Sequence, residues 1–253
     1  MKGMRKILIV FVMVCSVIII HAQPQLNLFD KQASLIFSFG TLVPNEEFAS
    51  NKENGLFAKD GFQLGFDVNY VIANGIGLGF NYEYNYFAFD KDAFLSISQP
   101  DRYLIRRGYR GNKIGMNLIF NLPIVIIPDK VTVNLFAEGN AGFRTMSIPD
   151  IDLEYNELSN RYVEVTYRSR SNAFGYLGYS GGLHLLFGQK YGVNVSYNAL
   201  MKSRHSLRYS VRKFDAQDNL FEEESFANNF LHHYGLQIGF VMYLPNNASK
   251  IRK

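Results

Sequence analysis

On either side of the pair Asn74-Gly75, every second residue of the stretch 61–86 is apolar or aromatic. The positions between them are mainly Gly, Asn and Gln, together with the acids Asp67 and Glu83. Alternation with a period of two predicts β-strands, because successive side chains of a strand point to opposite faces. Asn-Gly favours the tight turn of a β-hairpin. The stretch therefore predicts two antiparallel strands that share one apolar face.

The same alternation recurs in six further segments of the chain. These segments are residues 32–40, 113–121, 131–143, 177–187, 191–199 and 234–244. With the hairpin they make eight strands, most of about nine to eleven residues or longer, which is the length that a tilted strand needs to cross a bilayer. No convincing amphipathic helix lies between them. The pattern predicts an all-β fold, an antiparallel up-and-down eight-stranded transmembrane barrel.

Short and long connections alternate between these strands. The short ones are Ala73–Gly75, Pro123–Lys130 and Gly188–Lys190, and the long ones are residues 41–60, 88–112, 144–173 and 201–233. In an up-and-down barrel, alternate connections fall at the same end. Transmembrane barrels have this asymmetry, with short periplasmic turns and longer external loops. We therefore predict four long external loops.

The composition of the polar faces indicates which side of the strands meets lipid. A soluble surface usually carries roughly a quarter to a third charged residues. With Lys113 counted in the second long loop, the polar faces of these segments have no Lys or Arg, and their only acids are Asp67, Glu83 and Glu138. Small polar groups fit the crowded inside of a narrow barrel. We predict apolar side chains towards lipid and a bore filled by polar side chains.

Five polar residues are expected to form a network inside the bore. They are Asp67, Glu83, Glu138, His184 and Gln237, with Gln63 and the rim residue Arg144 as further partners. Buried acids need hydrogen-bonding partners, which favours a structural network. The alternative is a path for protons or ions.

The N-terminal segment has the three-part layout of a secretory signal peptide. Three basic residues come first (Lys2, Arg5 and Lys6), an apolar run follows from Ile7 to Ile20, and the small Ala22 precedes the expected cleavage point. The apolar run is too short for a comfortable membrane span. We predict a signal peptide at residues 1–22 and one barrel domain at residues 23–253, with a retained anchor as the alternative.

Removal of this segment would change the charge and the cysteine content. The only cysteine, Cys15, lies inside it, so the mature chain would have no disulfide and no thiol chemistry. Three of the 26 Lys and Arg residues would leave with it, and the remaining 23 nearly balance the 22 Asp and Glu residues. The isoelectric point near 9.0 is then mostly a property of the signal peptide. It gives no argument for a nucleic-acid partner.

In its strand number, alternation and loop asymmetry the chain resembles the small outer-membrane barrels of Gram-negative bacteria, the OmpX and OmpA membrane-domain class. The resemblance implies a location in the outer membrane, contact with membrane lipid, and insertion by the outer-membrane assembly machinery. Such barrels commonly end on an aromatic residue that serves as the assembly signal, and here Phe240 and Tyr243 are the internal candidates for it. The resemblance carries over no active residues.

Basic residues crowd the second long loop. Arg102, Arg106, Arg107 and Arg110 lie there, together with Lys113. Arginine binds planar anions through two parallel hydrogen bonds, and the phosphates of lipopolysaccharide are such anions. The alternative is that the loops are solvated strand extensions. Residues 162–167 and 207–211 still alternate, and Arg212-Lys213 would then pair across a hairpin with Glu222–Glu224.

Motifs for catalysis, metals or cofactors are weak in this sequence. His205 and Ser206 are adjacent, which in a strand points their side chains to opposite faces. Ser180, His184 and Glu138 form one candidate trio, but filling of the bore explains each of them. We predict no catalytic residues, no metal site and no cofactor. The expected role is structural or surface recognition, and the alternatives are an accessory barrel of an envelope secretion or uptake machine and a lipid A-modifying enzyme.

Overall fold

The structure, a computed structural model, describes residues 25–45, 48–51, 55–156, 162–170 and 172–244. The expected signal peptide at residues 1–22, with Cys15, lies outside the described residues. Within the described ranges, no helix is both long and apolar enough to cross a membrane.

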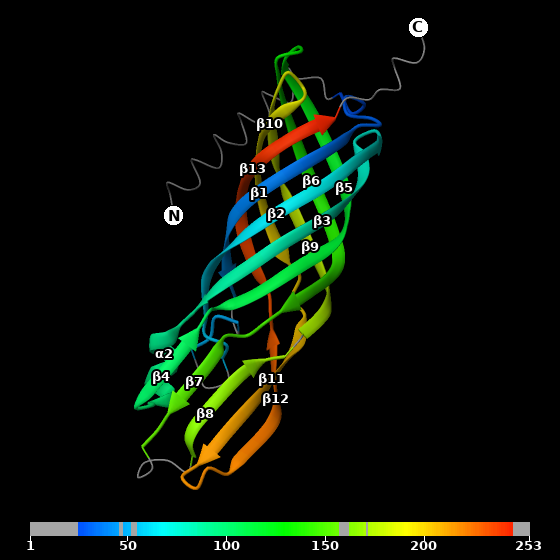
Figure 1. The fold of residues 1–253 in the computed structure, drawn as a ribbon. Coiled ribbons are helices and arrows are strands. Elements are labelled where there is room, and N and C mark those ends of the chain that lie inside the picture. The colour runs from blue at the N-terminus through cyan, green and yellow to red at the C-terminus, as the bar shows by residue number, and fades with distance from the viewer. Residues whose placement is uncertain (1–24, 46–47, 52–54, 157–161, 171, 245–253) are drawn as a thin grey trace, which may run out of the picture.

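Eight antiparallel strands close into a barrel (Figure 1). In chain order they are β1 (Ala33–Pro44), β2 (Ala58–Ala73), β3 (Ile76–Phe89), β5 (Tyr109–Ile127), β6 (Val131–Met146), β9 (Asn172–Phe187), β10 (Tyr191–Leu200) and β13 (His233–Leu244). Each strand pairs with its neighbours along the barrel, and pairing of β1 with β13 closes it. The eight strands correspond to the eight predicted segments, so the predicted fold class is confirmed.

The two faces of the barrel strands are also as predicted. In β13, Leu236, Ile238 and Phe240 point outward and are 63%, 59% and 47% exposed, whereas Gln237 between them is 9% exposed. Monomeric soluble proteins rarely expose a continuous apolar surface of this extent. The exterior of the barrel is therefore suited to lipid.

The short connections form tight turns at one end of the barrel. Asn74 and Gly75 have φ angles of 52° and 75°, which are those of the type I′ turn that Asn-Gly favours. The turn between β5 and β6 is shorter than predicted, because β5 continues to Ile127. The predicted turn Pro123–Lys130 is therefore mostly strand, with only residues 128–130 outside it.

Two turn glycines allow a direct test of this geometry. Gly75→Ala is expected to destabilise the barrel more than Gly188→Ala. Both positions have positive φ, which costs a non-glycine residue about 1–2 kcal/mol. A Cβ at Gly75 would also lie 2.2 Å from the carbonyl oxygen of Asn121, whereas nothing lies within 4 Å of one at Gly188. Urea unfolding in lipid vesicles measures the difference, and equal losses would contradict this clash.

Three of the four long connections assemble into a second, five-stranded sheet, which we call the loop sheet. Its strands are β4 (Arg102–Arg106), β7 (Asp150–Glu154), β8 (Tyr162–Ser169), β11 (Arg204–Asp215) and β12 (Leu220–Phe230), in the order β12-β11-β8-β7-β4. Figure 1 shows it projecting beyond the barrel, at the end opposite the short turns. A short helix, α2 (Lys91–Ser98), begins after its N-cap Asp90. The sequence had indicated no helix here, and a single eight-residue helix is too short for a clear apolar period.

Apolar clusters close the bore at both ends. At the short-turn end, Phe29 enters the barrel and stacks on Tyr243, with ring centroids 4.2 Å apart, beside Ile36 and Val241. At the other end, the cluster contains Leu42, Phe48, Leu56, Ala58, Phe87, Tyr109, Met146, Leu207 and Leu231. Tyr243 therefore points into the bore, whereas Phe240 faces outward. The polar side chains lie between these two apolar layers.

Candidate functional site

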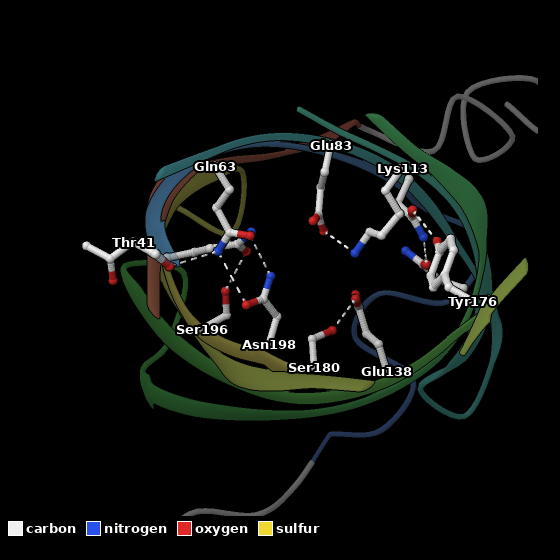
Figure 2. A network of polar contacts seen from close by, with 12 residues as sticks. Thr41, Gln63, Glu83, Lys113, Glu138, Tyr176, Ser180, Ser196 and Asn198 are labelled. Carbon is white, nitrogen blue, oxygen red and sulfur yellow. Dashed lines mark hydrogen bonds and ion pairs between the residues drawn. The ribbon is translucent and has the colours of Figure 1, made fainter. Parts of the chain in front are cut away.

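An ion pair lies in the polar layer of the bore. Nζ of Lys113 is 2.6 Å from Oε1 of Glu83, and the two side chains are 4% and 9% exposed (Figure 2). The prediction that Lys113 belongs to the basic residues of the second long loop is wrong. Strand β5 already begins at Tyr109, and Lys113 pairs with Glu83 of β3 in the barrel. The neighbouring acid is the physical reason why a cation is accommodated inside.

The other predicted network residues are divided between several contacts. Oγ of Ser180 donates to Glu138 at 2.9 Å, and Oγ of Ser196 donates to Gln237 at 3.2 Å. Gln63 and Asn198 exchange two further hydrogen bonds across the bore. Figure 2 shows the labelled members of these pairs pointing inward from the barrel wall.

A small void remains at the centre of this polar layer. Its volume is about 20 Å³, and Asp67, Glu83 and Glu138 all border it. This is about the space that one water molecule needs. The structure thus brings Asp67, Glu83, Glu138 and Gln237 around one void, in a bore that is closed by apolar side chains at both ends. This arrangement supports the structural network over an ion path.

Arg144 lies deeper than the rim position that we expected. It is fully buried, and its Nη1 donates to the carbonyl oxygen of Leu231 at 3.1 Å. The guanidinium also lies over the ring of Phe174, with 6.0 Å to the centroid. Its charge is therefore held under the apolar cluster at the loop end of the bore.

His184 does not join Ser180 and Glu138. Its Nδ1 lies 3.3 Å from Nδ2 of Asn134 and 3.2 Å from the hydroxyl of Tyr243, and its ring stacks on Phe136. A nucleophile needs a base within hydrogen-bond reach. Among the hydrogen bonds of the described residues, none joins Ser180 to His184. The candidate trio is thus not assembled.

One serine-histidine contact has no signal in the sequence. Oγ of Ser203 lies 2.6 Å from Nε2 of His205, whose ring stacks on Phe174. Burial and the neighbouring Arg144 lower the pKa of His205. The described contacts of His205 include no carboxylate that would orient its ring. Nor do the described residues contain a group of three or more His, Cys, Asp or Glu side chains placed to hold a metal ion.

The loop sheet has one charged face. On this face Arg168 pairs with Asp152 at 2.5 Å and Arg212 with Glu222 at 3.3 Å. Lys213 and Glu223, which are 2.8 Å apart, lie on the other face, opposite Val165 and Val211. The last two pairs confirm the predicted hairpin between Arg212-Lys213 and Glu222–Glu224. Most of these side chains are partly exposed, so each pair contributes little to stability.

Apart from Lys213 and Glu223, the opposite face of the loop sheet is mainly apolar. Its core is Ile105, Ile151, Leu153, Val165 and Val211, against which Phe94 and Leu95 of α2 pack. The long connections are therefore a folded unit with a core of its own, and they are not merely solvated extensions of the barrel strands.

The four predicted binding residues lie along β4 and its junction with β5. Arg102 and Arg106 are exposed on β4, an edge strand, opposite Glu154 and Asp150 of β7. Nη1 of Arg102 is 3.9 Å from Glu154, a long contact between exposed side chains. Arg107 has a positive φ of 69° between the two strands. Arg110, already in β5, is half-buried, and its Nε has no hydrogen-bond partner.

Comparisons with known proteins find only weak similarity, to solved structures. No known protein family matches the chain, and no curated protein matches it by sequence. Among solved structures, Neisserial surface protein A (NspA) is similar with a TM-score of 0.41 and 12% identity, over 83% of this chain and 96% of that one. OprG from Pseudomonas aeruginosa has a TM-score of 0.42 and 10% identity, over 87% and 99%.

The outer membrane protease OmpT from Escherichia coli is more distant in structure. Its TM-score is 0.30 and its identity 11%, over 88% of this chain and 98% of that one. Such values give no correspondence between individual residues, so a protease among these structures assigns no activity to this chain. The closed antiparallel barrel, apolar outside and polar within, makes this chain an eight-stranded transmembrane β-barrel.

Proposed function

We propose that the protein is a structural and surface-recognition barrel, in which the sealed bore anchors the chain in lipid and the loop sheet presents a binding surface outside the cell. The loop sheet carries this proposal, because it is a folded five-stranded unit with an apolar core and a charged face. The bore supports it as well. Apolar clusters at both ends and a central void of about 20 Å³ leave no continuous column of water for transport.

The position of the basic residues favours an anionic glycolipid as one binding partner. Arg106, Arg107 and Arg110 lie where β4 ends and β5 enters the barrel. Ile114 faces outward and is 46% exposed. Arg110 lies four residues before Ile114 in the sequence, which is about 13 Å of strand. An arginine at this distance from the outward-facing Ile114 is at a suitable level to contact lipid headgroups. Guanidinium groups bind phosphate oxygens through two parallel hydrogen bonds. We infer that these arginines, with Arg102 further out, contact the phosphates of lipopolysaccharide.

Replacement of Arg106, Arg107 and Arg110 together by Gln tests this inference. The change removes charge and keeps polarity, so the stability of the barrel should change little. Lipopolysaccharide that copurifies with the protein should fall about threefold to tenfold. The remaining binding should weaken further with salt, since the screening length is about 8 Å at physiological ionic strength.

The double variant Lys130→Gln with Lys190→Gln is the matched control. Both lysines lie in short turns at the opposite end of the barrel, so their loss should leave the lipopolysaccharide content unchanged. If the arginine variant retains as much lipopolysaccharide as the parent at low and high salt, the glycolipid assignment is wrong. Retained lipopolysaccharide with loss of a crosslinked envelope protein would instead favour the accessory-subunit alternative.

A further inference from the structure

An aromatic cavity lies between the loop sheet and the barrel. Its volume is about 580 Å³, within the range of small-molecule binding sites. Five parts of the chain build it: the first long connection, the end of β3 with α2, the start of β5, the link between β6 and β7, and strands β7, β8, β11 and β12 of the loop sheet. It is separate from the polar bore and from the basic residues at the junction of β4 and β5.

The lining of this cavity is aromatic and uncharged. Seven of its 13 lining residues are Phe or Tyr, and within the described chain none of the 13 is charged. Rings contribute large contact areas and favour offset or edge-on packing against other rings. The lining therefore favours a planar, apolar molecule, and it offers no charged partner to a carboxylate or phosphate.

The hydroxyls of Tyr167 and Tyr209 supply polarity at the sheet side. The two rings are 6.2 Å apart, and in the described part of the chain neither hydroxyl has a hydrogen-bond partner. By contrast, the hydroxyl of Tyr109 already donates to the carbonyl oxygen of Leu56 at 2.6 Å. Burial, with the nearby Tyr155, Tyr209 and Glu223, raises the pKa of Tyr167 to about 12. Its phenol therefore keeps its proton at neutral pH and remains a donor.

A strained residue forms part of the opposite wall. Phe57 has a φ of 54°, which is unusual for a bulky side chain, and it is 6% exposed. Its ring packs edge-on against Phe94, with centroids 5.6 Å apart. The carbonyl oxygen of Phe57 accepts a hydrogen bond from the amide of Asp90 at 2.7 Å. Backbone strain that the surroundings maintain in this way is concentrated at ligand-binding and active sites.

We propose that this cavity binds a small, uncharged, planar molecule that carries a hydrogen-bond acceptor. The rings hold the planar part, and Tyr167 and Tyr209 donate to the acceptor. This activity goes beyond recognition of a glycolipid by the arginines, and it does not depend on it. The cavity is too small for a folded partner or a long peptide.

Binding of 2-naphthol to the protein in lipid nanodiscs is the test. Its two fused rings and hydroxyl match the proposed class, and equilibrium dialysis against empty nanodiscs corrects for partition into lipid. We expect saturable binding that requires the protein. Naphthalene-2-sulfonate, which has the same rings and a negative charge, should bind more weakly. The absence of saturable binding of 2-naphthol would overturn the proposal, and stronger binding of the sulfonate would overturn the ligand class.

Two sets of variants locate the binding. Ala227→Trp fills the cavity from β12 and should abolish binding, whereas Glu224→Trp on the same strand, opposite Ser210, should not. Tyr167→Phe with Tyr209→Phe keeps the rings and should weaken binding of 2-naphthol about two- to tenfold for each donor lost, without affecting naphthalene. Unchanged binding in both Ala227→Trp and the double tyrosine variant would exclude this cavity as the site.

Discussion

Replacement of Lys113 by Met is expected to destabilise the folded barrel by about 3–5 kcal/mol, because it leaves the carboxylate of Glu83 buried without its cation. The two side chains are 4% and 9% exposed and 2.6 Å apart. Asp67 and Glu138 border the same void as Glu83, so loss of the cation would also leave three acids close together. Urea unfolding in lipid vesicles, followed by gel mobility with and without heating, measures the loss.

Two controls separate the buried pair from other effects of the substitution. Lys59→Met removes an ion pair with Asp90 at 3.0 Å, but Lys59 is 52% exposed, and we expect a loss of about 1 kcal/mol or less. Glu83→Gln combined with Lys113→Met removes both charges and should recover much of the stability. If the double variant is as unstable as Lys113→Met alone, the uncompensated carboxylate is not the cause.

Replacement of Ile238 by Arg should destabilise the barrel by about 2–4 kcal/mol in lipid, which is the range for a cation near the bilayer midplane. Ile238 points outward from the middle of β13 and is 59% exposed, between β1 and β10. The measurement is reversible unfolding in lipid vesicles, compared with the parent.

Leu244→Arg is the matched control on the same strand. Leu244 also points outward, but it lies at the end of β13, six residues or about 20 Å of strand from Ile238. Near the interface the cost should be about 0–1 kcal/mol. Equal costs at the two positions would contradict the depth assigned to Ile238, and no cost at either would indicate that this face meets water.

The barrel was largely predictable because its signals are local. A period of two marks each strand and its faces, and Asn74-Gly75 marks a turn whose φ angles the structure shows. Within the predicted network, Asp67, Glu83, Glu138 and Gln237 were identified by their positions on polar faces. Lys113 was missed because no local signal marks the beginning of β5. In the alternation of this strand, Lys113 falls on the same side as Gly115 and Asn117, which face inward.

The alternation of the sequence by itself determined eight strands, a lipid-facing apolar side and a bore of small polar groups. Side chains of a strand alternate between its two faces whichever strand it pairs with. Only the tertiary structure decided how the long connections fold. Pairing of Ile105 with Ile151, or of Val211 with Tyr167, joins segments that no turn connects directly. Such long-range contacts depend on the barrel holding the ends of β3, β5, β6, β9, β10 and β13 close together. The loop sheet and its aromatic cavity therefore follow from closure of the barrel.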